Sequence, residues 1–96
     1  MASCVLVVED ESDVLALCEF NLKGAGFKVI TASDGDEGLR KALSGGVDLV
    51  VLDVMLPGRD GFDVCRTIRA DPAAGRMPII MLTARAEEID RVLGLE

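Results

Sequence analysis

The sequence predicts an α/β domain built on a parallel sheet. Segments rich in Val, Leu and Ile alternate along the chain with segments whose apolar residues recur at helical spacing, and the connections between them are short. The segment 49–52 is apolar at every position, which is typical of a strand that helices cover on both faces. The 96 residues suffice for one small domain, which we expect over 1–96.

The first half of the chain contains two predicted strand–helix units. The segment 4–8 is the first strand, and a helix over 12–23 follows, with Leu15, Cys18 and Leu22 on one buried stripe. Glycines at 24 and 26 end this helix.

The second unit begins with a strand over 27–32. A helix then starts at Asp34, because Asp34 with Glu37 three residues later forms a capping-box pattern. Leu39, Ala42 and Leu43 are its predicted inner face, and the glycine pair 45–46 ends it.

The second half continues the alternation. We expect a strand over 47–52, a loop over 54–61, a helix over 62–70, a strand over 77–82 and a last helix over 86–95. Phe62, Cys65 and Ile68 are predicted to point inward from the helix over 62–70, and the breaker segment 71–75 separates it from the next strand. Short right-handed crossovers would connect these units into one sheet.

Acidic residues follow two of the predicted strands. Asp53 ends the apolar run, and Glu9, Asp10 and Glu11 follow the first strand. Ligands of parallel sheets bind at the carboxyl ends of the strands. If these strands are neighbours, their carboxylates share one crevice and repel one another unless a cation joins them. Oxygen ligands of this kind suit Mg²⁺.

Composition excludes several classes of function. The formal net charge of −7 argues against direct binding to nucleic acid or to an anionic membrane surface. The absence of histidine removes histidine-based acid–base catalysis and most zinc sites. No apolar stretch approaches the roughly 20 residues of a membrane helix, and no signal peptide is visible, so we expect a cytoplasmic location. The three cysteines have no CxxC spacing and are predicted to be small buried hydrophobes.

Four motifs follow one another along the chain: Val7-Val8-Glu9-Asp10-Glu11, Leu52-Asp53-Val54-Met55-Leu56-Pro57-Gly58, Asp60-Gly61-Phe62 and Pro78-Ile79-Ile80-Met81-Leu82-Thr83-Ala84-Arg85. In this order they resemble the receiver domain of bacterial two-component response regulators. The segment 82–91, which begins in the last motif, looks most like the subfamily whose output is a winged-helix DNA-binding domain.

The resemblance implies a flavodoxin-like fold with strand order 2-1-3-4-5. It implies that Asp53 is the phosphoacceptor, taking a phosphoryl group from a phosphohistidine of a sensor histidine kinase. Mg²⁺ would be bound by Asp10, Asp53, the backbone carbonyl of Met55 and, through water, Glu9. The hydroxyl of Thr83 would contact the phosphoryl group and report phosphorylation to a switch surface.

Each of these residues also has a plain structural interpretation. The acidic turn after the first strand could be a solvated start of the first helix. Asp53 could be a polar residue at a strand end, and Thr83 could cap the helix that follows it. Only the joint order and spacing of the motifs favour the functional interpretation.

The chain departs from the family at its end. Receiver domains continue into a fifth strand that carries a phosphate-binding lysine, and then into a fifth helix. Both are missing from 1–96, so we expect a C-terminally truncated receiver with strand order 2-1-3-4. Lys23, Lys28 and Lys41 lie in the wrong elements to replace that lysine. The alternative function is therefore an inactive or phosphorylation-independent interaction module with the receiver fold.

Two further expectations concern partners and catalysis. The predicted strand over 77–82 is an apolar sheet edge, so we expect a homodimer or other self-association through this edge or the last helix. We do not expect an enzyme beyond self-catalysed phosphotransfer and dephosphorylation. An aspartate-nucleophile phosphatase needs a second acid at position 55, which is Met55, and a nucleotide site needs a glycine-rich first turn, which here is acidic.

Overall fold

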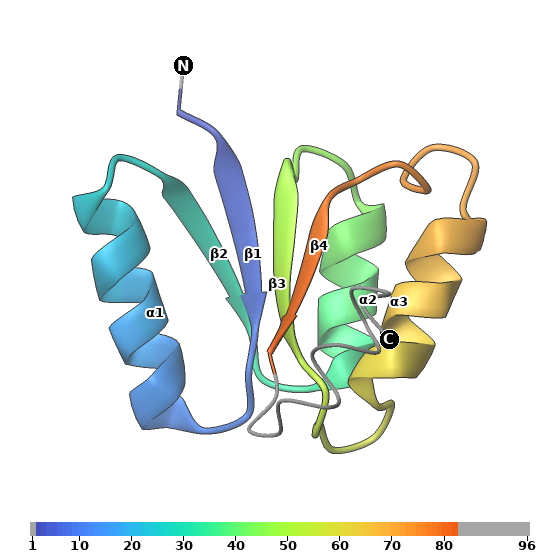
Figure 1. Cartoon of the computed structure of the whole chain (residues 1–96), viewed down its shortest axis with the longest axis horizontal. Helices are drawn as coiled ribbons and strands as arrows, with labels where there is room; N and C mark the ends of the chain where they lie inside the picture. The colour runs from blue at the N-terminus through green and yellow to red at the C-terminus, as the bar shows by residue number, and fades with distance from the viewer. Residues whose placement is uncertain (1, 83–96) are drawn as a thin grey trace, which may run out of the picture.

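A computed structural model describes residues 2–82 of the chain (Figure 1). Strands and helices alternate strictly over this range, as the sequence predicts. In chain order the elements are β1 (Cys4–Val8), α1 (Ser12–Gly24), β2 (Lys28–Ala32), α2 (Gly35–Leu43), β3 (Leu49–Asp53), α3 (Gly61–Ala70) and β4 (Ile79–Leu82).

The four strands form one parallel sheet in the order β2-β1-β3-β4, which confirms the predicted order. The central strands β1 and β3 are paired from Val5 opposite Leu49 to Val8 opposite Leu52. Helix α1 lies on one side of the sheet, and α2 and α3 lie together on the other (Figure 1). This placement follows from right-handed crossovers. The chain moves in one direction along the sheet from β1 to β2, and in the opposite direction from β2 to β3 and from β3 to β4.

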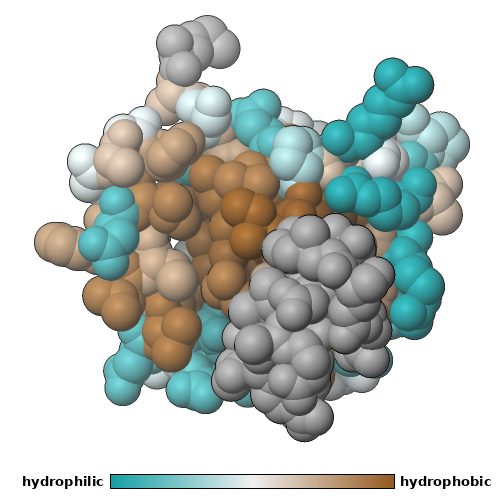
Figure 2. All heavy atoms as spheres, viewed as in Figure 1, coloured by the Kyte–Doolittle hydropathy of each residue, from teal (hydrophilic) through white to brown (hydrophobic). Residues whose placement is uncertain are grey.

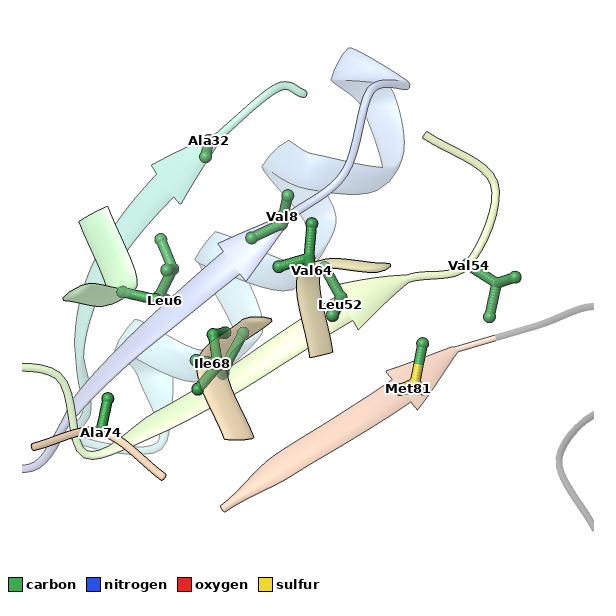
Figure 3. Close-up of a cluster of buried hydrophobic side chains, with 11 residues drawn as sticks. Leu6, Val8, Ala32, Leu52, Val54, Val64, Ile68, Ala74 and Met81 are labelled. Carbon is green, nitrogen blue, oxygen red and sulfur yellow. The ribbon is translucent and has the colours of Figure 1, made fainter. Parts of the chain in front are cut away.

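The main hydrophobic core lies between the sheet and the pair α2 and α3 (Figure 3). Leu6 and Leu52 come from the central strands, and Val64 and Ile68 come from α3; all four are fully buried. Val64 was not among the residues predicted to point inward. Phe62 and Cys65, which were predicted there, are only partly buried and pack around this core.

The opposite face of the sheet is less completely covered. Helix α1 has no fully buried residue, and its predicted inner stripe of Leu15, Cys18 and Leu22 is only half-buried. Apolar side chains gather over this side of the molecule (Figure 2). They line an open apolar groove between α1 and the strands β3 and β4, formed by Leu17, Cys18, Asn21, Leu22, Val51, Ile80 and Leu82.

β3 and β4 begin two residues later than predicted, and β2 begins one residue later. At the start of β3, the side chain of Asp48 accepts a hydrogen bond from the amide of Cys4 at 2.7 Å. Before β4, the amide of Met77 donates to Ala74 in a turn, and Pro78 has no amide hydrogen to give to a ladder. The predicted helix over 86–95 lies outside the described residues.

Candidate functional site

The acidic residues of the predicted site lie where the two central strands end. Val8 and Leu52 form the last pair between β1 and β3. Glu9, which follows β1, and Asp53, which is the last residue of β3 and pairs with Leu82 of β4, therefore lie side by side at this edge. Glu9 remains attached to the sheet, because its amide donates to the carbonyl of Ala32 at 3.0 Å. The sequence predicted this meeting of two acidic strand ends at the carboxyl edge, and the structure confirms it.

The carboxylates of Glu9, Asp10 and Asp53 converge at this edge. One oxygen from each lies within 4.8 Å of the other two, and this is the one such group found within residues 2–82. Their environments differ: Glu9 is 7% exposed, Asp53 is half-buried and Asp10 is exposed. Three acids this close, one of them buried, form an arrangement that a cation would stabilise.

Burial dominates the electrostatics of Glu9. Removal of its carboxylate from water raises the pKa of Glu9 to about 7, although the hydrogen bond from the amide of Glu11 at 2.9 Å works in the opposite direction. The negative charge of Asp53 and the contacts with Asp10 and Asp53 raise the pKa of Glu9 further. The site therefore favours a bound proton on Glu9 when no cation is present to balance its charge.

Asp53 is oriented by the loop that follows it. The amide of Met55 donates to Oδ1 of Asp53 at 3.2 Å, and the amide of Gly61 closes the loop by donating to the carbonyl of Val54 at 3.0 Å. Glycine is required at position 61, because a Cβ there would overlap the Asp53 carbonyl and lie 2.8 Å from Val54 Cα. Met55 is 77% exposed and its thioether is a poor ligand for a hard cation, so its backbone is the part that can serve this site.

Arg59 braces the same loop against two helices. Its Nε donates to Asp36 in α2 at 3.1 Å, and its Nη1 donates to Asp63 in α3 at 2.8 Å. Sequence reasoning did not identify this contact. The spacing of four between Arg59 and Asp63 indicates a pair at a helix start, but only the fold brings Asp36 to the same guanidinium.

The residues present fit a hard divalent cation. Glu9, Asp10 and Asp53 offer carboxylate oxygens, and the Met55 carbonyl is the additional oxygen ligand that the family resemblance implies. The structure brings the three acids together and places Met55 two residues beyond Asp53 in the chain. Thr83, the fifth predicted site residue, lies outside the described residues.

Comparisons with known proteins agree with this architecture. The family model of the response regulator receiver domain matches residues 5–96. The alkaline phosphatase synthesis transcriptional regulatory protein PhoP of Bacillus subtilis (strain 168) is 52% identical over 92 residues, which cover 96% of this chain and 38% of PhoP. The chain thus spans well under half the length of this curated relative.

Solved receiver structures are close in fold. A putative response regulator from Chloroflexus aurantiacus J-10-fl has a TM-score of 0.89 at 34% identity, over 99% of this chain and 78% of that one. The receiver domain of sensor histidine kinase PA1611 from Pseudomonas aeruginosa PAO1, which holds a magnesium ion in its active-site cleft, has a TM-score of 0.88 at 35% identity, over 96% of this chain and 75% of that one.

The chain belongs to the response regulator receiver domain family, and it is a signalling domain of two-component systems. Its four-stranded parallel sheet with flanking helices is the corresponding part of the flavodoxin-like receiver fold. Among residues 2–82, no helix has the length and apolar character needed to cross a lipid bilayer.

Proposed function

We propose that Asp53 accepts a phosphoryl group in a Mg²⁺-dependent reaction. The observation that carries this proposal is the convergence of Glu9, Asp10 and Asp53 at the carboxyl ends of β1 and β3. A lone aspartate at a strand end would be a surface polar residue, but three converging carboxylates, one of them buried, repel one another unless a cation or a proton balances their charge. The magnesium ion in the cleft of the PA1611 receiver supports the same assignment.

The residues of the site would have distinct roles. Asp10, Asp53 and the Met55 carbonyl would bind Mg²⁺ directly, and Glu9 would bind it through water. The ion would supply positive charge that offsets the repulsion between the acids and an incoming phosphoryl group. The carboxylate of Asp53 is the nucleophile: it attacks phosphorus and forms an acyl phosphate as the bond to the donor breaks. The hydroxyl of Thr83 would donate a hydrogen bond to the transferred phosphoryl group.

The phosphoryl donor and the output follow from the family. We infer that the donor is a phosphohistidine of a sensor histidine kinase, and that phosphorylation of the receiver controls transcription through a DNA-binding output domain. The relationship to PhoP, a transcriptional regulatory protein, supports this output. Such a receiver acts in the cytoplasm. The acidic charge of −7 speaks against direct contact between this segment and DNA.

We also infer that the 96-residue chain self-associates. Within the described residues β4 pairs only with β3, and Ile80 and Leu82 of β4 are 51% and 38% exposed. Leu17 on α1 adds to the same apolar groove with 61% of its surface exposed. Exposed apolar surface next to an unpaired strand edge favours association between chains.

Intact-protein mass spectrometry tests the phosphoacceptor function. The chain is incubated with a small acyl phosphate donor, with Mg²⁺ or with EDTA. We expect one phosphoryl adduct with Mg²⁺ and a strong reduction with EDTA. Asp53→Asn should abolish the adduct, because the amide is not a nucleophile of this kind, and Asp10→Asn should reduce it. An unmodified parent chain that is folded by circular dichroism would contradict the proposal and favour the interaction-module alternative.

A further inference from the structure

Arg59 connects the loop after β3 to both helices on that side of the sheet. Its guanidinium bonds to Asp36 in the first turn of α2 and to Asp63 in the first turn of α3. Arg66 also pairs with Asp63, at 3.2 Å, but within residues 2–82 it forms no hydrogen bond or ion pair with the loop or with α2. Arg59 is therefore the cation within residues 2–82 that holds α2, α3 and the loop over 54–60 together.

The loop approaches α2 closely at this point. The amide of Gly35 faces the carbonyl of Pro57 at 3.4 Å, and a Cβ on Gly35 would overlap the carbonyl of Arg59. Gly58 takes a positive φ of 77°, and a Cβ there would lie 3.4 Å from the Asp36 carboxylate. The backbone of the loop thus packs closely against the start of α2, and the Arg59–Asp36 hydrogen bond lies at this contact.

The same loop borders the acidic site. Pro57 and Gly58 line an open pocket together with Asp10. Met55, whose carbonyl would bind the cation, donates its amide to Asp53 and precedes in the chain the loop residues that Arg59 holds against α2 and α3. We propose that Arg59 is a positioning residue: by bridging Asp36 and Asp63, it fixes the loop that carries Met55 and strengthens Mg²⁺ binding. This inference rests on the metal site of the proposed function.

Two physical effects of Arg59 on Mg²⁺ affinity have opposite signs. Because Arg59 carries a positive charge, it repels the cation, so its removal by charge alone would leave Mg²⁺ binding unchanged or tighten it. As a brace for the loop, it preorganises an oxygen ligand, so its removal would weaken Mg²⁺ binding. The direction of the change in affinity therefore separates positioning from simple electrostatics.

The experiment measures Mg²⁺ affinity by isothermal titration calorimetry, with chemical unfolding of each variant as the stability readout. Arg59→Gln is compared with Arg66→Gln, which removes the same charge from the same cluster without removing a hydrogen bond between the loop and the helices. We expect Arg59→Gln to bind Mg²⁺ roughly threefold or more weakly than the parent, and Arg66→Gln to bind as tightly or more tightly. Arg59→Lys keeps the charge but cannot bridge both acids, so its affinity should fall between the parent and Arg59→Gln.

The possible results separate this inference from the function on which it rests. Equal or tighter binding by Arg59→Gln relative to Arg66→Gln would overturn the positioning role while leaving the metal site intact. A loss of unfolding stability in Arg59→Gln without weaker Mg²⁺ binding would overturn it too, because the brace would then be only structural. A parent chain that shows no Mg²⁺ binding, or whose binding survives Asp10→Asn, would overturn the metal site and this inference together.

Discussion

At the residue scale, Glu9 shows how burial raises the pKa of a carboxyl group in the proposed cation site. Its folded-state pKa of about 7 exceeds the value of 4.5 for an unperturbed glutamate, chiefly because the carboxylate is removed from water. The folded chain therefore holds a proton in the pH range where the unfolded chain has lost it. It follows that the stability linked to Glu9 is present at low pH and is lost as the pH rises through about 7.

This linkage predicts an unusual pH dependence. In EDTA, the free energy of unfolding should fall between pH 5 and pH 7.5, by up to about 3 kcal/mol since each pKa unit is worth about 1.4 kcal/mol. Glu37 has a lowered pKa with the opposite sign, but its transition lies below 4.5 and outside this range. Urea unfolding at several pH values measures the slope.

Two controls sharpen the pH experiment. Glu9→Gln cannot ionise, so its stability should be nearly constant over the same range, and saturating Mg²⁺ should reverse much of the parent's loss. The chain contains no histidine, so no imidazole adds a transition there. A parent chain whose stability rises with pH, or matches the slope of Glu9→Gln, would contradict the account of Glu9.

The sequence allowed us to predict which acidic residues meet at this edge of the sheet, but not how deeply each is buried or what it contacts. The position of Asp53 and Asp10 could be predicted because residues that follow the strands of a parallel sheet lie together at its carboxyl edge. The burial of Glu9 could not, since it depends on how the turn after β1 packs. The partners of Arg59 were also missed, because Asp36 lies 23 residues away and comes near only through the fold.

At the element scale, the loop between β3 and α3 is shaped by close backbone contacts. Asp60 caps α3 by accepting from the amide of Asp63 at 2.9 Å, and Gly61 begins the helix directly against the end of β3. The predicted N-cap of α2 is confirmed, but the second hydrogen bond of the capping box has a different donor. Asp34 accepts from the Glu37 amide at 2.7 Å, but the Glu37 carboxylate accepts from the amide of Ser33 rather than from that of Asp34.

Gly61→Ala tests the close approach. The added Cβ would meet backbone atoms of Asp53 and Val54, which cannot rotate away, so we expect a loss of roughly 2 kcal/mol or more in the free energy of unfolding. Gly24→Ala is the matched control: no atom lies within 4 Å of its Cβ position, and alanine favours the last turn of α1, so its stability should be unchanged or slightly higher. Equal stability of the two variants in urea unfolding would contradict this prediction, because it would show that the loop backbone can shift to accept a Cβ at position 61.

The element boundaries show where pattern reasoning stops. Hydrophobic periodicity predicted every helix and strand between 2 and 82 in the correct order. It extended β3 and β4 by two residues each at their starts, because apolar character alone does not reveal that Met77 donates within a turn. Those starts depend on local hydrogen bonds rather than on composition.

At the scale of the whole molecule, the two faces of the sheet are unequal. The face toward α2 and α3 holds the main core, whereas apolar side chains remain at the surface beside α1 (Figure 2). Leu17 and Ile80, which line the groove there, are more than half exposed. The sequence predicted an apolar strand edge at β4. It did not predict that α1 itself has no fully buried residue, because its apolar stripe is only half covered by the sheet.

Self-association through this groove can be tested directly. The parent chain should form dimers or larger species at micromolar concentration in light scattering with size-exclusion chromatography. Ile80→Thr keeps a β-branched residue in the strand but makes the groove polar, so it should shift the chain toward the monomer. Leu43 of α2 was predicted to face inward but is exposed, and it lies outside the groove, so Leu43→Gln should not shift the chain toward the monomer. A monodisperse parent monomer would contradict this proposal.

The central claim is that Asp53, in the acidic site at the carboxyl ends of β1 and β3, receives the phosphoryl group. The most direct measurement treats the chain with a small acyl phosphate and Mg²⁺, reduces the acyl phosphate with borohydride, and locates the resulting homoserine by tandem mass spectrometry. The account predicts the modification at position 53, and its absence when Mg²⁺ is chelated. Modification at another carboxylate, or equal modification without Mg²⁺, would contradict the claim.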